Sequence, residues 1–223
     1  MLKNNYKREY LIVDNAYDYI NNKIIQGEIE LGEKILIKNL SEDLNVSLTP
    51  IREAIRKLES QGLIELLPRK GFIVKKYNMK QIDEIYAVRQ ILEITAIRLA
   101  CNKIKKKDLD KTKKINKKIY KTILNGKKDI LTIKKLNEDF HLTLYKISNN
   151  ELLCEIIQNL WDRTAGLFIQ LFKNPFQGKT TFQEHNEILM ALEAKNTDKV
   201  VDLMKNHLQV NKESLFTFLN KLA

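Results

Sequence analysis

The sequence predicts a mainly α-helical protein with a single β-hairpin about one third of the way along the chain. The 223 residues are 43% apolar and 30% charged, a balance typical of a folded protein with a substantial core. Seven glycines and three prolines interrupt the chain, and long stretches repeat apolar residues at the helical period. The pattern changes once, where two short apolar runs flank residues 68–71, Pro-Arg-Lys-Gly, which is typical of a hairpin with a tight tip.

Three helices are expected before the hairpin. The first ends near Gly27 and buries one apolar face, which consists of Val13, Ala16, Tyr17, Ile20 and Ile24. The second and third cover about residues 37–44 and 48–61, and either Ser47 or Thr49 caps the third. Three helices followed by a hairpin form a winged helix-turn-helix, which we place at residues 1–77.

The remainder of the chain, residues 78–223, shows only helical periodicity. We expect an antiparallel bundle of six to seven helices, at about 79–104, 108–125, 129–148, 150–173, 179–195 and 197–221. No stretch approaches the roughly 18 apolar residues of a membrane span, and the amino terminus lacks the pattern of a secretion signal. Cys101 and Cys154 stand alone in helical patterns and are expected to be reduced. We therefore expect a cytoplasmic protein with no membrane partner.

Positive charge is concentrated in the middle of the chain. The net charge is +11, and residues 103–135 carry fourteen Lys against three Asp. Residues 48–76 carry seven Lys or Arg against three Glu. The lysine-rich stretch is either a solvated helical surface or a basic flank that helps to hold nucleic acid.

The helix that begins near Leu48 has the amphipathic pattern of a DNA-reading helix. Its inner face consists of Ile51, Ala54, Ile55 and Leu58, and its outer face displays Arg52, Arg56 and Lys57. Arg52 and Arg56 are one helical turn apart, where both can reach base edges and phosphates in the major groove. The competing interpretation is that they pair with Glu53 and Glu59 as ordinary surface charges.

The 43 residues from Gly32 to Val74 resemble the N-terminal domain of GntR-type transcription regulators. The resemblance rests on the TPIREA core, the LESQGLI helix end and the PRKG tip of the hairpin. It implies a set of DNA contacts: Thr49 with a phosphate, Arg52 and Arg56 in the major groove, and Gly71 at the wing tip in the minor groove with Arg69 and Lys70 beside it. Leu48 stands where the family has arginine, so one major-groove contact is missing or changed.

All three histidines of the chain lie on the apolar faces of expected helices. These are His141, His185 and His207, and Asn137 lies one helical turn before His141. A histidine on an apolar face is usually a hydrogen-bonded core residue, but three of three on such faces is unusual. Three imidazoles and one oxygen donor make a complete ligand set for a transition metal.

The helices after the hairpin resemble the FCD ligand-binding domain of the FadR subfamily. The matching stretches are AVRQILEITAIRLA, NEDFHLTLYKISNN and EHNEILMALEAKNTDKV, followed by His207. The resemblance implies a metal site made of Asn137, His141, His185 and His207. Because Asn137 replaces the usual aspartate, the oxygen donor is neutral, and we expect Zn²⁺ or Ni²⁺ rather than Mn²⁺ or Mg²⁺. The competing interpretation is a polar core cluster that is hydrogen-bonded to its neighbours and to water.

Arg89 lies in the middle of the apolar seam of its helix and needs an anionic partner there, because an unpaired buried charge is very costly. Glu93, one turn later, is one candidate for this anion. The other is the carboxylate of a small effector, which the FCD resemblance favours and which a guanidinium can hold with two hydrogen bonds. Arg163 is a weaker second candidate for binding the effector.

These observations predict a DNA-binding transcription regulator, and a repressor because most relatives of this type repress. We expect a homodimer on a palindromic operator, controlled by a small organic acid bound at the metal. One alternative is a regulator with a structural metal or none and a larger apolar effector. A metal-dependent enzyme is disfavoured, because Glu138 and Asp139 point away from His141 and Glu184 is not on the face of His185.

Overall fold

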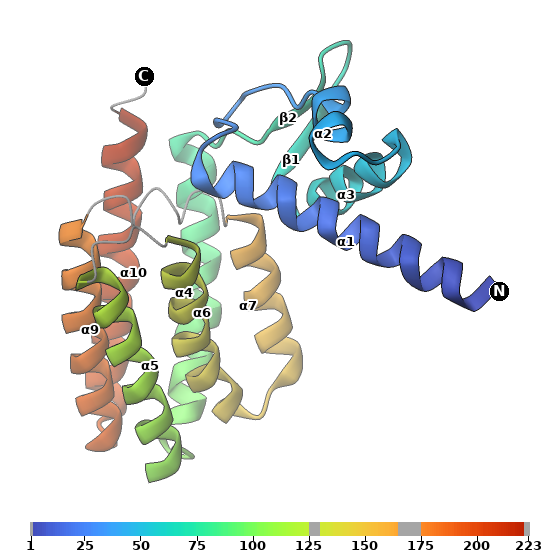
Figure 1. Cartoon of the computed structure of the whole chain (residues 1–223). Helices are drawn as coiled ribbons and strands as arrows, with labels where there is room; N and C mark the ends of the chain where they lie inside the picture. Colours follow the sequence, from blue (N-terminus) through green and yellow to red (C-terminus); the bar gives the residue numbers. More distant parts are fainter. Residues whose placement is uncertain (1, 125–129, 165–174, 221–223) are drawn as a thin grey trace. The chain divides into compact units, whose positions relative to one another are not determined.

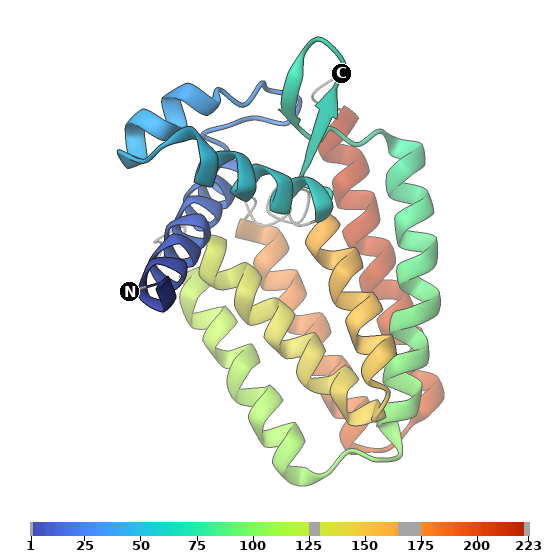
Figure 2. The ribbon, with the colours of Figure 1, turned by 90° about the vertical axis from the view of Figure 1, so that its right-hand side faces the viewer.

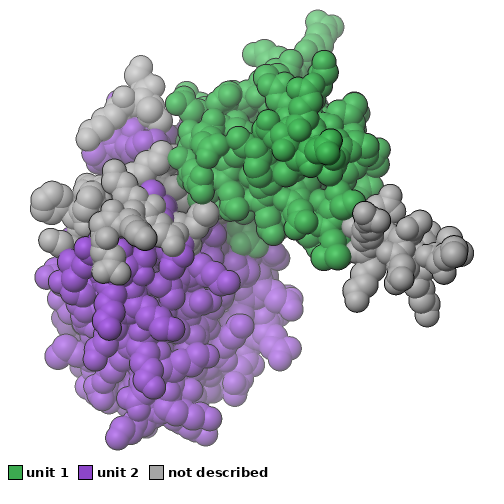
Figure 3. All heavy atoms as spheres, in the orientation of Figure 1, with its two compact units in different colours: residues 1–76, 162–166 green, residues 77–161, 167–223 purple. Residues whose placement is uncertain are grey.

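The computed structural model describes residues 2–124, 130–164 and 175–220 and confirms a mainly helical protein with one β-hairpin (Figure 1). The chain divides into two compact units (Figure 3). Residues 1–76 with 162–166 form the first unit, and residues 77–161 with 167–223 form the second. Among the described residues, the hairpin belongs to the first unit and the second contains only helices.

The first unit is a winged helix-turn-helix. It contains α1 (Leu2–Gln26), α2 (Ile37–Leu44), α3 (Leu48–Ser60), β1 (Ile64–Leu67) and β2 (Gly71–Val74). The inner face of α3 is as predicted, because Ile51, Ala54, Ile55 and Leu58 are all 0% exposed. They pack in one apolar cluster with residues of the other elements, including Ala16, Ile20, Leu40 and Val74. Burying each large side chain contributes about 1.5–3 kcal/mol, so this cluster fixes the position of α3.

The hairpin is paired on both sides of β2. On one side β2 runs antiparallel to β1, with register from Ile64 opposite Val74 to Leu67 opposite Gly71. On the other side, Gly32 N–H donates to the carbonyl of Val74, and Ile35 N–H donates to the carbonyl of Phe72, each at 2.8 Å. The sequence did not predict this second partner, because the paired segment, residues 32–35, contains a single large apolar residue, Ile35. The pairing holds the hairpin firmly behind its exposed tip.

The second unit is the predicted bundle of helices. Its described helices are α4 (Met79–Cys101), α5 (Lys106–Leu124), α6 (Ile130–Tyr145), the 3₁₀ turn η1 (Lys146–Ser148), α7 (Glu151–Arg163), α9 (Pro175–Glu193) and α10 (Thr197–Asn220). The helix α5 lies beside α6 and α9, and α10 lies beside α4 and α9 (Figures 1 and 2). A capping box starts α4, in which Asn78 Oδ1 accepts from Gln81 N–H at 2.9 Å and Gln81 Oε1 accepts from Asn78 N–H at 3.0 Å.

Some helix boundaries differ from the prediction. The helix expected at 129–148 is α6 followed by η1, and the next residue, Asn149, has φ 58° and stops the turn. The described part of α7 ends at Arg163, and residues 165–173 of the helix expected there lie outside the described residues. The helix α9 begins at Pro175, four residues early, because proline is tolerated in a first helical turn. None of the described helices combines the length and apolarity that crossing a membrane requires.

Candidate metal centre and DNA interface

The three histidines converge from three helices in the interior of the second unit. His141 comes from α6, His185 from α9 and His207 from α10, and they are 3%, 0% and 2% exposed. One ring nitrogen of each lies within 4.8 Å of the others. The ring centroids are 4.9–5.2 Å apart. Residues separated by 66 positions in the sequence therefore form one buried cluster of imidazoles.

His185 is held in a single orientation by Asn116 of α5. The amide Nδ2 of Asn116 donates to the carbonyl of Phe182 at 3.2 Å and to Asn186 Oδ1 at 3.0 Å. Asn116 Oδ1 must then be the atom that faces His185 Nδ1, at 3.1 Å, and it can only accept. His185 therefore carries its proton on Nδ1. Its Nε2 is buried, is left as an acceptor and has no hydrogen-bond partner.

His207 is oriented by Glu184 of α9, whose Oε2 lies 2.7 Å from His207 Nδ1. A carboxylate only accepts, so Nδ1 again carries the proton and Nε2 is the acceptor. The amide of Asn211 lies 3.3 Å from this Nε2, a long hydrogen bond. Glu184, which was not expected on the face of His185, contacts the histidine of the next helix.

His141 is oriented by Tyr145, and its Nδ1 is also the donor. The hydroxyl of Tyr145 donates its proton to Glu93 Oε2 at 2.7 Å, so its oxygen remains to accept from His141 Nδ1 at 3.4 Å. Burial, and then the nearby Glu93 carboxylate, raise the pKa of Tyr145 well above its ordinary value, so the hydroxyl keeps its proton. All three imidazoles thus have Nδ1 as a donor and Nε2 as an acceptor. The Nε2 of His185 has no partner, and that of His207 accepts the long bond from Asn211.

Two further buried oxygens lack partners, and each belongs to a residue one helical turn before a histidine of the cluster. Asn137, one turn before His141, is 4% exposed, and its Oδ1 has no hydrogen-bond partner. Thr181, one turn before His185, is 1% exposed, and its hydroxyl also has none. A buried polar atom without a partner costs about 1–3 kcal/mol, so these atoms are candidates for contact with a ligand. The donor set, three imidazole nitrogens and a neutral oxygen, fits a transition metal.

The interior keeps two of these imidazoles neutral. Burial lowers the pKa of His141 well below its ordinary value, and the nearby His207 and Arg89 lower it further. Burial, followed by His141 and His207, likewise lowers the pKa of His185. Neutral imidazoles are ready to bind a cation without first losing protons.

Arg89 is paired inside the protein. Its Nε lies 2.7 Å from Glu93 Oε1, and the two side chains are 7% and 1% exposed. The indole of Trp161 donates to the same oxygen at 2.9 Å, and the Arg89 guanidinium lies over the Trp161 ring at 5.7 Å. Although burial opposes its charge, the Glu93 carboxylate raises the pKa of Arg89 above its ordinary value. The anion that Arg89 requires is therefore supplied by Glu93. The side chain of Arg163 lies outside the described residues.

In the first unit, α3 exposes the arginines that the sequence singles out. Arg52 and Arg56 are exposed, and neither forms an ion pair with any described residue, so the proposed pairing with Glu53 and Glu59 is absent there. Lys57 behaves differently, because its Nζ lies 3.0 Å from Asp14 Oδ1 and 4.6 Å from the centre of the Tyr17 ring. Lys57 thus joins α3 to α1, while the two arginines project outward.

The tip of the hairpin presents a second basic surface. Arg69 and Lys70 are exposed, and Lys70 N–H closes the turn on the carbonyl of Leu67 at 3.1 Å. Arg69 has φ 65° and Gly71 has φ 85°. The left-handed conformation at Gly71 favours glycine and bends the strand directly after the tip. Thr49, in the first turn of α3, is also exposed.

Two family models match this architecture. The model described as "Bacterial regulatory proteins, gntR family" covers residues 12–74, and the model described as "FCD domain" covers residues 84–210. The chain belongs to the GntR family and carries an FCD domain. It is therefore a DNA-binding transcription regulator rather than an enzyme.

Several named relatives of this GntR-family chain are transcriptional regulators, and each match covers most of both chains. It is 30% identical to the HTH-type transcriptional regulator McbR of Escherichia coli, over 87% of this chain and 88% of that protein. It is 31% identical to the HTH-type transcriptional regulator YdhC of Bacillus subtilis, over 82% and 81%. The HTH-type transcriptional repressor RspR of E. coli is 27% identical, over 89% and 86%. The solved structure of E. coli McbR/YncC superposes with a TM-score of 0.77 at 28% identity, covering 93% of this chain and 98% of that one.

Sequence reasoning missed the residues that orient the histidines. Asn116, Glu184 and Tyr145 each accept from one imidazole Nδ1, and Thr181 adds an unpartnered hydroxyl. The sequence did contain a signal for Asn116, because it shares one face of a lysine-rich helix with the apolar residues Leu109 and Ile119. In the structure Asn116 is 0% exposed. No comparable signal existed for Glu184, because its partner lies on another helix.

The lowered pKa values predict a pH dependence of stability for the metal-free protein. The unfolded chain takes up protons on histidine below about pH 6.5, and folded His141 and His185 do not. Stability should therefore fall as the pH drops below about 6.5, by about 1.4 kcal/mol per pH unit for each of these two histidines. Urea unfolding with a chelator present, at pH 7.5, 6.5 and 5.5, measures this slope.

His141→Gln is the control for that experiment, because it removes one of the two titrating groups and should reduce the slope by about half. A wild-type stability that is unchanged or higher at pH 5.5 than at pH 7.5 would show that the two imidazoles become charged in the folded protein.

Proposed function

We propose that this regulator is a homodimeric repressor whose operator affinity is set by a small organic acid bound at a metal in the FCD domain. One observation carries the proposal: one ring nitrogen from each of three buried imidazoles lies within 4.8 Å of the others, and the buried oxygen of Asn137, one helical turn before His141, has no partner. A cluster of this kind costs free energy unless a cation occupies it.

The chemistry of the donors favours Zn²⁺ or Ni²⁺. His141, His185 and His207 supply nitrogen, and Asn137 supplies an uncharged oxygen, so the protein adds no negative charge directly to the metal. When bound, such a metal can accept oxygen atoms of an exogenous ligand at its remaining positions. The Thr181 hydroxyl is a candidate hydrogen-bond donor to that ligand.

Arg89 is the residue we propose to bind the effector carboxylate. It lies close enough to the cluster to lower the pKa of His141, and its bond to Glu93 uses Nε. A guanidinium has four further N–H donors, so Glu93 can orient Arg89 while the terminal nitrogens bind a carboxylate. Arg163 remains a second candidate for the same role.

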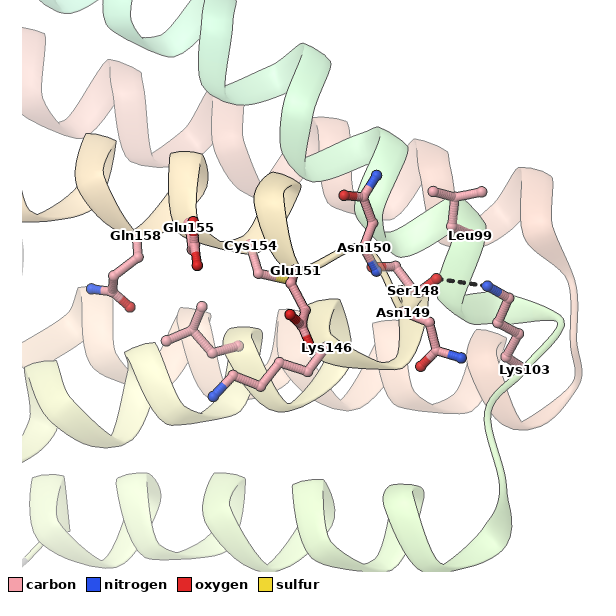
Figure 4. Close-up of a pocket in the computed structure, with 11 residues that line it drawn as sticks. Leu99, Lys103, Lys146, Ser148, Asn149, Asn150, Glu151, Cys154, Glu155 and Gln158 are labelled. Carbon is pink, nitrogen blue, oxygen red and sulfur yellow. Dashed lines mark hydrogen bonds between the residues drawn. The ribbon is translucent and has the colours of Figure 1, made fainter.

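A larger apolar effector is less well supported. A pocket of about 1110 Å³ is lined by the C-terminal ends of α4 and α6, by η1 and by α7 (Figure 4). Its lining includes the charged residues Lys103, Lys146, Glu151 and Glu155, and Lys103 Nζ donates to the carbonyl of Ser148 at 2.6 Å. Such a lining suits water or polar groups better than an acyl chain.

Dimerisation is supported by an exposed apolar face on two neighbouring helices. Val88, Ile91 and Leu99 on α4 and Leu152 and Ile156 on α7 are 40–68% exposed. Trp161 of α7 donates to Glu93 of α4, which fastens the two helices side by side (Figure 2). An apolar stripe over two helices is typical of a surface that a partner covers, and a two-fold dimer suits a palindromic operator.

On DNA, we assign the major-groove contacts to Arg52 and Arg56, a phosphate contact to Thr49, and the minor-groove contact to the wing tip, Arg69, Lys70 and Gly71. The exposure of the threonine, the three arginines and the lysine in one unit supports this assignment. The named repressor RspR supports repression as the output. The effector shifts operator affinity only to the extent that it binds one conformer of the dimer more tightly than the other.

The metal proposal predicts one Zn²⁺ or Ni²⁺ per chain. His141→Ala and His185→Ala should each lose the metal, because each removes one of three nitrogen donors, whereas Cys154→Ala, a buried thiol outside the cluster, should keep it. Elemental analysis of the purified variants measures occupancy. Full occupancy in both histidine variants would exclude this site.

The proposal that a small organic acid binds at the metal is tested with the same proteins, by measuring melting temperatures in the presence of different acids. A binding acid at about 100 times its dissociation constant should stabilise the metal-loaded wild type by about 2.7 kcal/mol and have little effect after metal removal. Equal stabilisation with and without metal would contradict an effector bound at the metal.

The DNA assignment predicts that Arg52→Ala loses sequence-specific binding. One bidentate contact with a base is worth about 1–3 kcal/mol in each DNA-binding unit, and Arg52 is exposed, so the melting temperature should not change. Lys57→Ala is the matched control, because it removes the same charge from the same helix but from a side chain bound to Asp14. Gel shifts with specific and random DNA measure the affinity. An equal loss of specific binding in both variants would show that Arg52 does not contact a base.

The dimer proposal predicts that Ile91→Glu produces monomers with weakened operator binding. Met190→Glu is the matched control, because Ile91 and Met190 are both 68% exposed and Met190 lies on α9. Light scattering after size-exclusion chromatography measures the mass. A dimeric Ile91→Glu protein would place the interface elsewhere.

A further inference from the structure

The outer side of α3 carries an apolar residue in line with its two arginines. Leu48, Arg52 and Arg56 are spaced four residues apart, so they lie along one face of the helix. Leu48 is 44% exposed, whereas the other leucine and the two isoleucines of α3 are 0% exposed. Among the leucine, isoleucine and alanine side chains of α3, Leu48 is thus the one that does not contribute to the core.

An isolated exposed leucine is common on protein surfaces, and the position of this one is what gives it significance. Leu48 is the first residue of α3, and the N-terminal residues of a recognition helix are those that contact base edges. The first turn of α3 contains no acidic residue, and the Ser47 side chain makes no capping bond. Close approach of this end of the helix to DNA is therefore not opposed by negative charge.

The chemistry of Leu48 restricts what it can recognise. Its side chain has no hydrogen-bond donor or acceptor, and the one apolar group in the major groove is the C5-methyl of thymine. Against guanine or cytosine, the leucine would cover polar edge atoms without replacing their hydrogen bonds with water, which is unfavourable. Contact with thymine instead buries one methyl group against the side chain.

We propose that Leu48 is a specificity-determining residue that selects thymine at one position of each operator half-site. The inference rests on the proposed base-reading role of α3. Four residues of helix rise about 6 Å, and base pairs are stacked about 3.4 Å apart. The selected thymine should therefore lie about two base pairs from the base that Arg52 contacts.

The test begins with selection of binding sites from random-sequence duplex DNA by the full-length wild type, Leu48→Ala, Leu48→Arg and a control, Leu124→Ala, which alters an exposed leucine of α5. We expect one thymine per half-site in the wild-type and control sequences. This preference should be absent with Leu48→Ala, and Leu48→Arg should prefer guanine there, because arginine pairs with the guanine edge. Because Leu48 is exposed, all variants should keep the wild-type melting temperature.

The second arm replaces that thymine with deoxyuridine in the selected duplex, which removes only the methyl group. Wild-type affinity should fall about fourfold for one half-site and about 15-fold for both, the value of roughly one buried methyl group in each. Leu48→Ala should bind the thymine and deoxyuridine duplexes equally. Identical selected sequences for the wild type and Leu48→Ala, or equal sensitivity of both to deoxyuridine, would overturn the role of Leu48 alone. No enriched sequence with the wild type would refute sequence-specific reading and this proposal together.

Discussion

A polar side chain inside the bundle must find its hydrogen-bond partner within the protein, and this requirement organises the second unit. Glu93 is the centre of the network, because its carboxylate accepts from Arg89, Tyr145 and Trp161. These bonds tie α4 to α6 and α7. Through Tyr145 they also set the orientation of His141. Removing one partner from such a network leaves a buried charge uncompensated, which costs several kcal/mol. The same interactions therefore hold the helices together and orient one imidazole of the histidine cluster.

The network also orients the three imidazoles at the site that we propose for a metal. Each Nδ1 has a different acceptor, and each acceptor comes from a side chain that other bonds or packing keep in place. One nitrogen of each ring lies within 4.8 Å of the others, and both the Nε2 of His185 and the Oδ1 of Asn137 are buried without a hydrogen-bond partner. A polar core that served packing alone would satisfy these atoms internally. Here His185 Nε2 and Asn137 Oδ1 are left without a partner, and both residues belong to the metal site that we propose.

In the first unit, α3 is anchored through its inner face while its outer face stays exposed. The inner face of α3 is fully buried against α1, and Lys57 adds an ion pair with Asp14 at the edge of that contact. This anchoring leaves Leu48, Arg52 and Arg56 on a rigid outer face without partners of their own among the charged residues described. The wing is supported in the same manner, since β2 is paired on both edges while its basic tip remains exposed. Rigid support behind exposed side chains is what reading a DNA sequence requires.

By itself, the sequence determined which segments are helical, where the hairpin lies, and which faces of α3 and of the histidine-bearing helices turn inward, because periodicity reports burial directly. It also predicted that Arg89 needs an anion, although not that Glu93 supplies it, since both partners were compatible with one helical face. Only the tertiary structure decided that Glu184 orients His207, that Asn116 orients His185, and that residues 32–35 pair with β2. These contacts join residues on different elements, and their distances depend on how the helices and strands pack. No local pattern in the chain encodes that arrangement.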